Sequence, residues 1–214
     1  MFLFYGDFIM SFPSVLAFED GSVFHGIGYG KEKYDVGEIV FNTSMSGYQE
    51  IITDPSYKKQ IITFTHPHIG NTGTNPEDNE SNMVHASGVV VKNFCEKPSN
   101  WRSSKTLEEF LLENDVMAIS NVDTRQITSI LREKGAQNCC IGSLSKISEQ
   151  DAVNKAKEFS GLKGLDLAKV VSTEKNFIWD EGIWPNHSQS KINHPVVALD
   201  FGIKKNILRL LSDS

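Results

Sequence analysis

Short runs of apolar and β-branched residues, separated by glycine-containing turns, dominate the first half of the chain. Residues 15–18 and 22–25 flank Glu19-Asp20-Gly21, whose Asp-Gly pair is typical of a hairpin turn. Further runs rich in Val, Ile, Thr and Phe occupy residues 38–42, 60–65 and 87–92. The pattern predicts a β-strand at each of these positions.

Three segments combine a helix start signal with apolar residues at helical spacing. Their N-cap candidates are Thr106, Asp123 and Ser148, and each has an acidic residue or glutamine at the third position after it. The helices expected behind them read LEEFLLEN, TRQITSILREKG and DAVNKAKEF. Gly135 and Gly161 are the expected stops of the second and third helices. Strands and helices together predict the α/β class.

The last residues follow a different pattern. Residues 196–199 (VVAL) have the length and branching of a buried parallel strand, and Asp200-Phe201-Gly202 would form the turn after it. One helical face then carries Ile203, Ile207, Leu210 and Leu211. This is the opening of a βα unit, and no second parallel strand follows within residues 1–214. We therefore expect the residues from about 195 to be poorly packed.

Residues 182–195 are polar, contain two prolines and lack periodicity, which is typical of a linker. The expected domain organisation has four parts: an extension at 1–13, a first domain at 14–180, a linker at 181–194, and the truncated start of a second α/β domain at 195–214.

Charge and cysteine content narrow the function classes. The chain has 21 basic and 27 acidic residues, a formal net charge of −6 and no basic block, which argues against nucleic acid as a partner. The apolar N-terminus is too short to span a membrane and has no basic start. Three cysteines, two of them adjacent, make a poor disulfide framework, so we expect a reducing, cytoplasmic location.

Residues 41–75 contain the highest concentration of candidate functional residues. Small polar residues and glycines alternate there with strand-like runs, as in loops that present hydroxyls and amides to a ligand. Asp54-Pro55-Ser56 is equally a good β-turn, so a purely structural role stays open. His66 and His68 could bind a metal, but no third ligand stands at suitable spacing, and we expect no metal site.

Two other groups of residues are weaker candidates. The glycines of Gly26-Ile27-Gly28-Tyr29-Gly30 resemble a dinucleotide loop, but turn and strand residues follow them where that loop requires a helix. Cys95, Cys139 and Cys140 have no evident neighbouring base, so we expect them to be structural and not nucleophiles.

Long runs of the sequence resemble the small, glutamine-hydrolysing subunit of carbamoyl-phosphate synthase. The stretch GEIVFNTSMSGYQEIITDPSYKKQIITFTHPHIGNTGTN is similar to its N-terminal domain, as are LAFEDGSVFHG, SNWR, NVDTRQITSILREKGAQN and GLDLAKVVSTEKNFIW. VVALDFGIKKNILRLL resembles the first strand and helix of the family's class I glutamine amidotransferase domain. The resemblance covers about residues 14–214.

The resemblance implies a three-layer β/β/α (swivelling-type) first domain that docks on the large synthetase subunit. It also implies glutamine hydrolysis by a Cys nucleophile, a His base and an acidic partner, none of which has a counterpart in residues 1–214. Ammonia would pass to the large subunit, which uses ATP, Mg²⁺ and bicarbonate to make carbamoyl phosphate for arginine and pyrimidine synthesis. This chain itself would bind no cofactor.

One ligand residue carries over: the serine of the family's DPSY motif, here Ser56, helps bind L-glutamine. The loops at 42–48 and 66–75 are weaker candidates for lining a domain or subunit interface. Two alternatives remain. The chain could be a non-catalytic docking module for the large subunit, or it could belong to a different amidotransferase. The second is disfavoured because the specific motifs lie outside the shared glutaminase fold.

Overall fold

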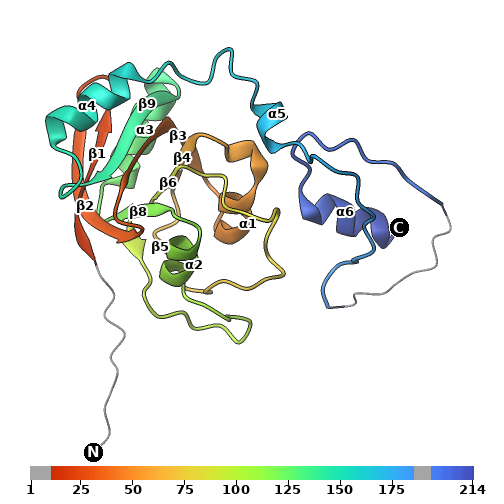
Figure 1. The fold of residues 1–214 in the computed structure, drawn as a ribbon. Helices are drawn as coiled ribbons and strands as arrows, with labels where there is room; N and C mark the ends of the chain where they lie inside the picture. The colour runs from red at the N-terminus through yellow and green to blue at the C-terminus, as the bar shows by residue number, and fades with distance from the viewer. Residues whose placement is uncertain (1–10, 186–193) are drawn as a thin grey trace, which may run out of the picture.

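Seven strands pair edge to edge into a closed barrel in the order β1-β2-β8-β6-β4-β3-β9, and β9 returns to pair with β1 (Figure 1). The computed structural model describes residues 11–185 and 194–214. The barrel strands are β1 Phe12–Phe18, β2 Val23–Gly30, β3 Tyr34–Asn42, β4 Gln60–Phe64, β6 Gly88–Val90, β8 Met117–Ser120 and β9 Gln137–Ser143. Two short parallel strands, β5 His68–Ile69 and β7 Asn93–Phe94, form a separate ladder.

Alternation of side chains along the strands divides the core into an inside and an outside. Leu16 and Phe18 of β1 belong to the cluster inside the barrel, whereas Val15 and Ala17 point outward beneath a helix. Ile61 and Ile62 of β4 divide in the same way. Both faces of these strands are therefore buried, which explains why the strands read as nearly continuous apolar runs.

Helices cover the outer faces of the barrel. The helical elements are α1 Tyr48–Thr53, the short 3₁₀ helix η1 Pro55–Tyr57, α2 Leu107–Glu113, α3 Thr124–Lys134, α4 Glu149–Glu158, α5 Leu167–Val171 and α6 Lys205–Ser212. Helix α4 packs on β1 and β9, α1 and α2 cover β4, β6 and β8, and α3 adds Ile127 and Leu131 to the inner cluster. Figure 1 shows α5 and α6 on the far side of α1 from β1 and β2. No described helix has both the length and the apolar character needed to cross a membrane.

The predicted helix starts are confirmed. Thr106 and Glu109 form a reciprocal capping box at the start of α2. The side chains of Asp123 and Ser148 accept hydrogen bonds from the backbone N–H groups of Gln126 and Asp151, at the starts of α3 and α4. Local side-chain chemistry was thus sufficient to place these three helices.

The α/β class is confirmed, but the three-layer arrangement is not. β9 pairs with both β1 and β3, so the sheet closes on itself and does not end in two free edges. Of the expected extension at 1–13, residues 1–10 lie outside the described part, and β1 already begins at Phe12. Of the expected linker, residues 186–193 lie outside it as well.

The strand predicted at 196–199 is wrong. Its residues are in extended, unpaired backbone, and Val197 is 87% exposed. Among the described residues no strand lies alongside to accept its N–H groups, and a lone strand cannot satisfy its own backbone. The helix predicted after it is confirmed as α6, whose residues include the exposed Leu210 and Leu211.

Candidate functional site

Ser56 lies on a turn whose shape is fixed by its neighbours. Helix α1 ends at Thr53, and Pro55 begins η1. The buried Asp54 carboxylate accepts a hydrogen bond from the Ser56 backbone N–H at 2.9 Å. Ser56 is exposed, and its hydroxyl has no hydrogen-bond partner among the described residues. A rigid turn therefore presents an unused hydroxyl to the surface.

A segment from the other end of the chain meets this turn. The Lys204 ammonium lies 3.5 Å from the Asp54 carboxylate. Gly202 has a φ of +96°, and a Cβ placed on it would come within 3.1 Å of the Pro55 Cβ, so the two backbones are in close approach. The Asp200 carboxylate accepts hydrogen bonds from the N–H groups of Gly202 and Ile203. The predicted Asp200-Phe201-Gly202 turn is thereby confirmed, and it lies beside Pro55, which precedes Ser56.

The surface at Ser56 is open. A pocket of about 250 Å³ lies between the 74–83 loop and α2, and Thr53 is part of its wall, but Ser56 does not line it. Any ligand held by the Ser56 hydroxyl would need a second wall from outside the barrel. The segment 200–206 lies where such a wall would begin.

Two ionisable groups in this part of the fold, His85 and Glu50, have shifted pKa values. His85 is buried with its Nδ1 atom unpartnered, and burial, followed by the charge of Lys58, lowers the pKa of its imidazole. Burial also raises the pKa of Glu50, and the carboxylates of Asp78 and Glu80 add to that effect. The electrostatics therefore favour a neutral imidazole near Asp54 at neutral pH.

The other candidates from the sequence are not brought together with Ser56. His66 and His68 lie with their ring centroids 6.4 Å apart, and no cluster of metal-ligating side chains occurs among residues 11–185 and 194–214. Gly26 to Gly30 lie inside β2 and do not form the strand-to-helix loop that a dinucleotide site requires. The 42–48 loop does reach the turn, because the Asn42 amide donates to the Tyr57 hydroxyl at 3.0 Å.

Two of the three cysteines lie in a barrel strand. Cys139 and Cys140 are fully buried in β9, and burial raises the pKa of the Cys140 thiol to about 12 and that of Cys139 well above its usual value. Cys95 follows β7 and is partly exposed, with its thiol 3.4 Å from the Lys97 carbonyl. No described histidine is hydrogen-bonded to any of the three thiols.

Thiol labelling tests this arrangement. In the folded chain at pH 8, we expect a thiol reagent to modify Cys95 readily. It should modify Cys139 and Cys140 about a thousandfold more slowly than it does in the urea-unfolded chain. A thiol with a pKa of about 12 is almost entirely protonated at that pH, and burial blocks access. Mass spectrometry of labelled peptides gives the three rates, and rapid native labelling of β9 would contradict the prediction.

Sequence reasoning missed Lys204 and Glu80, which connect the C-terminal segment to the barrel. The Glu80 carboxylate and carbonyl both accept hydrogen bonds from the first N–H groups of α6. The sequence did carry a signal for this contact. The residues directly before α6 include no Ser, Thr, Asp or Asn, which are the usual N-cap residues. Such a helix needs a cap from elsewhere in the fold.

Comparison with known proteins gives a consistent family. The sequence model of the family described as "Carbamoyl-phosphate synthase small chain, CPSase domain" matches residues 16–141. The carbamoyl phosphate synthase small chain of Thioalkalivibrio sulfidiphilus is 55% identical over 206 residues, which cover 94% of this chain and 54% of that protein. The protein of the same description from Vibrio cholerae is 51% identical over 211 residues, covering 95% and 56%. The chain thus spans about half the length of the curated relatives it matches.

Solved structures give only distant similarity. A peptidase M28 precursor from Shewanella amazonensis aligns with a TM-score of 0.36 and 8% identity, over 62% of this chain and 35% of that one. An aminopeptidase from an Aneurinibacillus strain aligns with a TM-score of 0.37 and 14% identity, over 63% and 32%. Similarity this low implies nothing about activity.

Proposed function

The chain belongs to the carbamoyl-phosphate synthase small chain family, and from this premise we propose that it forms part of a glutamine-hydrolysing small subunit. In this role the small subunit hydrolyses glutamine and delivers ammonia to a large synthetase subunit. The large subunit then makes carbamoyl phosphate from bicarbonate and ATP with Mg²⁺, for arginine and pyrimidine synthesis in the cytoplasm. Residues 14–180 would form the docking domain in the three-layer arrangement typical of the family.

The observation that carries this proposal is the free hydroxyl of Ser56 on a preformed turn, beside the segment 200–206. A hydroxyl in this setting can hydrogen-bond the charged amino-acid end of glutamine with little loss of conformational entropy. The second wall of the site would come from the glutaminase domain that residues 195–214 begin. Ser56 therefore has the role of a substrate-binding residue in the proposal and takes no part in bond breaking.

The chemistry of hydrolysis would be done by groups outside residues 1–214. A cysteine thiolate attacks the glutamine amide carbon, ammonia leaves with a proton from the histidine base, and a thioester forms. Water then hydrolyses the thioester to glutamate. An acidic residue would orient the histidine, and backbone N–H groups would stabilise the oxyanion of each step. Within the proposal, this chain's contribution is to bind the substrate and to dock.

Substitution Ser56→Ala, made in the complete small chain assembled with the large chain, tests the proposal. We expect KM for glutamine to rise about tenfold, because a hydrogen bond to a charged group is lost. Carbamoyl phosphate synthesis from free ammonia should be unchanged, since it bypasses glutamine binding. The matched control is Ser160→Ala, an exposed serine just after α4 on the outside of the barrel. An unchanged KM for glutamine would remove Ser56 from the site.

A non-catalytic docking role is the second candidate, and large exposed apolar side chains favour it. Met45 and Trp101 are each 81% exposed, and methionine and aromatic side chains are enriched in protein interfaces. A domain that only docks would bind the large subunit with an affinity independent of Ser56. Pull-down of the large subunit by wild-type and Ser56→Ala chains, together with the glutamine KM, separates the two roles.

A further inference from the structure

Helix α6 begins without a cap of its own. Its N-cap residue is Lys204, whose side chain makes no capping hydrogen bond, and its first turn has no acidic residue. Lys204 instead extends toward Asp54, and Lys205 adds another positive charge at the same end. The first N–H groups of a helix have no partners within it and carry a partial positive charge. α6 therefore starts in a locally unfavourable way unless another part of the fold compensates.

Glu80 provides that compensation from the barrel domain. Its carbonyl oxygen accepts a hydrogen bond from the Lys205 N–H at 2.8 Å, and its carboxylate Oε2 accepts one from the Asn206 N–H at 2.9 Å. Asn206 is the second residue of the helix, the position that an ordinary N-cap side chain would bond. Glu80 is only 8% exposed, so water does not replace these bonds easily.

Glu80 is held by the residue that also begins the Ser56 turn. Its backbone N–H donates to the Thr53 hydroxyl at 2.9 Å, and that hydroxyl donates to the Gln49 carbonyl at 2.8 Å within α1. The Ser81 hydroxyl donates to the Thr53 carbonyl at 2.7 Å. Thr53 is buried and is followed directly by Asp54. One short network therefore fixes both the Ser56 turn and the start of α6.

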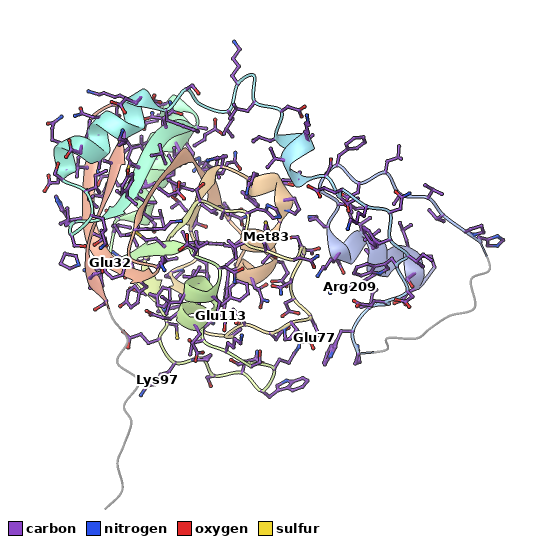
Figure 2. The ribbon with its side chains drawn as sticks, viewed as in Figure 1. Glu32, Glu77, Met83, Lys97, Glu113 and Arg209 are labelled. Carbon is purple, nitrogen blue, oxygen red and sulfur yellow. The ribbon has the colours of Figure 1, made fainter. Side chains whose placement is uncertain are left out.

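Figure 2 shows where the loop that carries Glu80 lies relative to α6. Glu77 and Met83 label the loop that carries Glu80, and Arg209 labels α6 on the side of the molecule that this loop faces. The loop lies between α1 and the C-terminal segment, so a rotation of α6 would have to break the Glu80 bonds or the Lys204–Asp54 pair. Two contacts at one helix end define its direction better than either contact alone.

We propose that Glu80 is a positioning residue that caps α6 across the domain boundary and so holds the second wall of the glutamine site at a fixed distance from Ser56. This inference rests on the proposed function. Glu80 would not touch glutamine. Its loss would loosen α6 and weaken glutamine binding without changing the chemical steps that follow.

Amide hydrogen exchange tests the cap without any glutamine chemistry. In residues 1–214 carrying Glu80→Ala, we expect the Asn206 amide to exchange about fivefold faster, the usual consequence of losing an N-cap bond. The Lys205 amide should be accelerated less than the Asn206 amide, because its acceptor is the backbone carbonyl that the substitution retains. In Glu80→Gln the side-chain oxygen can still accept, so the exchange rate of Asn206 should remain close to that of wild type. The matched control is Glu77→Gln, in the same loop but with no side-chain partner among the described residues.

Steady-state kinetics test the positioning role in the complete small chain assembled with the large chain. We expect Glu80→Ala to raise KM for glutamine about fivefold, Glu80→Gln to restore it, and ammonia-dependent synthesis to be unaffected in both. An unchanged Asn206 exchange rate in Glu80→Ala overturns the cap. An unchanged glutamine KM, in an enzyme where Ser56→Ala does raise it, overturns the positioning role. If Ser56→Ala itself has no effect, the proposed function fails and the positioning role falls with it, and the exchange result alone decides on the cap.

Discussion

Residues 1–214, purified by themselves, are expected to release no ammonia from glutamine above the uncatalysed rate. Thioester formation needs a thiolate, a base and oxyanion donors in one place. Cys139 and Cys140 are buried with raised pKa values, so neither is a thiolate at neutral pH. Cys95 is partly exposed, but its thiol contacts the Lys97 carbonyl, which cannot act as a base. Glutaminase activity in residues 1–214 should therefore be absent and not merely reduced.

A continuous ammonia assay at saturating glutamine measures this directly. The positive control is the complete small chain under the same conditions, and the background is the same buffer without protein. Cys95→Ser in residues 1–214 provides a second control, because Cys95 is the thiol left accessible by the fold. Ammonia release that depends on Cys95 would show that the chain has a nucleophile of its own and would contradict the division of roles proposed above.

The helices could be predicted from sequence because their signals are local. Thr106, Asp123 and Ser148 each satisfy N–H groups within the next three residues, so no distant partner is needed to place the helix start. Barrel closure could not be predicted in this way. It depends on β9 pairing with β1 and β3, which lie about a hundred residues or more away in the sequence, and nothing in the apolar pattern of one strand identifies its neighbours.

The strand predicted at 196–199 shows that a local strand pattern can also mislead. An apolar, β-branched run predicts burial and extension correctly only when a neighbouring strand completes the ladder. In the described structure the run is extended, but Val197 and Leu199 are exposed and unpaired. Propensity alone did not form the strand, and the sequence contains no local signal that distinguishes this case.

The candidate site was only half predictable. Ser56 was predicted as a site residue because the Asp-Pro-Ser turn is a local pattern and because its motif resembles a known family, and its role stays a prediction. Glu80 lies in a polar loop with no motif, and its role depends on α6, which starts 125 residues later. The physical link is a missing cap at one place and an available carboxylate at another, and only the fold brings them together.

The second large effect that we expect is a loss of stability when a side chain is added at a glycine of β2. We expect packing, and not nucleotide binding, to require glycine there. Gly26 directly precedes Ile27, whose pairing with Ser120 begins the β2–β8 ladder. A Cβ placed there would overlap the Ser120 backbone oxygen and would lie 2.8 Å from Ile119 Cγ1 and 2.9 Å from Val122 Cγ1. The backbone oxygen cannot move aside as a flexible side chain could. Gly26→Ala should therefore cost about 3 kcal/mol or more, a large part of the roughly 5–15 kcal/mol that stabilises an ordinary domain.

Urea unfolding of residues 1–214, followed by tryptophan fluorescence and circular dichroism, gives the free energy of unfolding for the variant and for wild type. Gly21→Asn is the matched control in the same hairpin. Gly21 has a φ of +92° and no atom within 4 Å of its hypothetical Cβ, and asparagine tolerates left-handed backbone better than most residues, so the cost should stay below about 1 kcal/mol. If the two substitutions cost the same, close packing of β2 on β8 is not what requires Gly26. If Gly26→Ala alone is severe, the glycine at this position is accounted for by barrel packing, because the Ser120 backbone oxygen and the side chains of Ile119 and Val122 leave no room for a Cβ there.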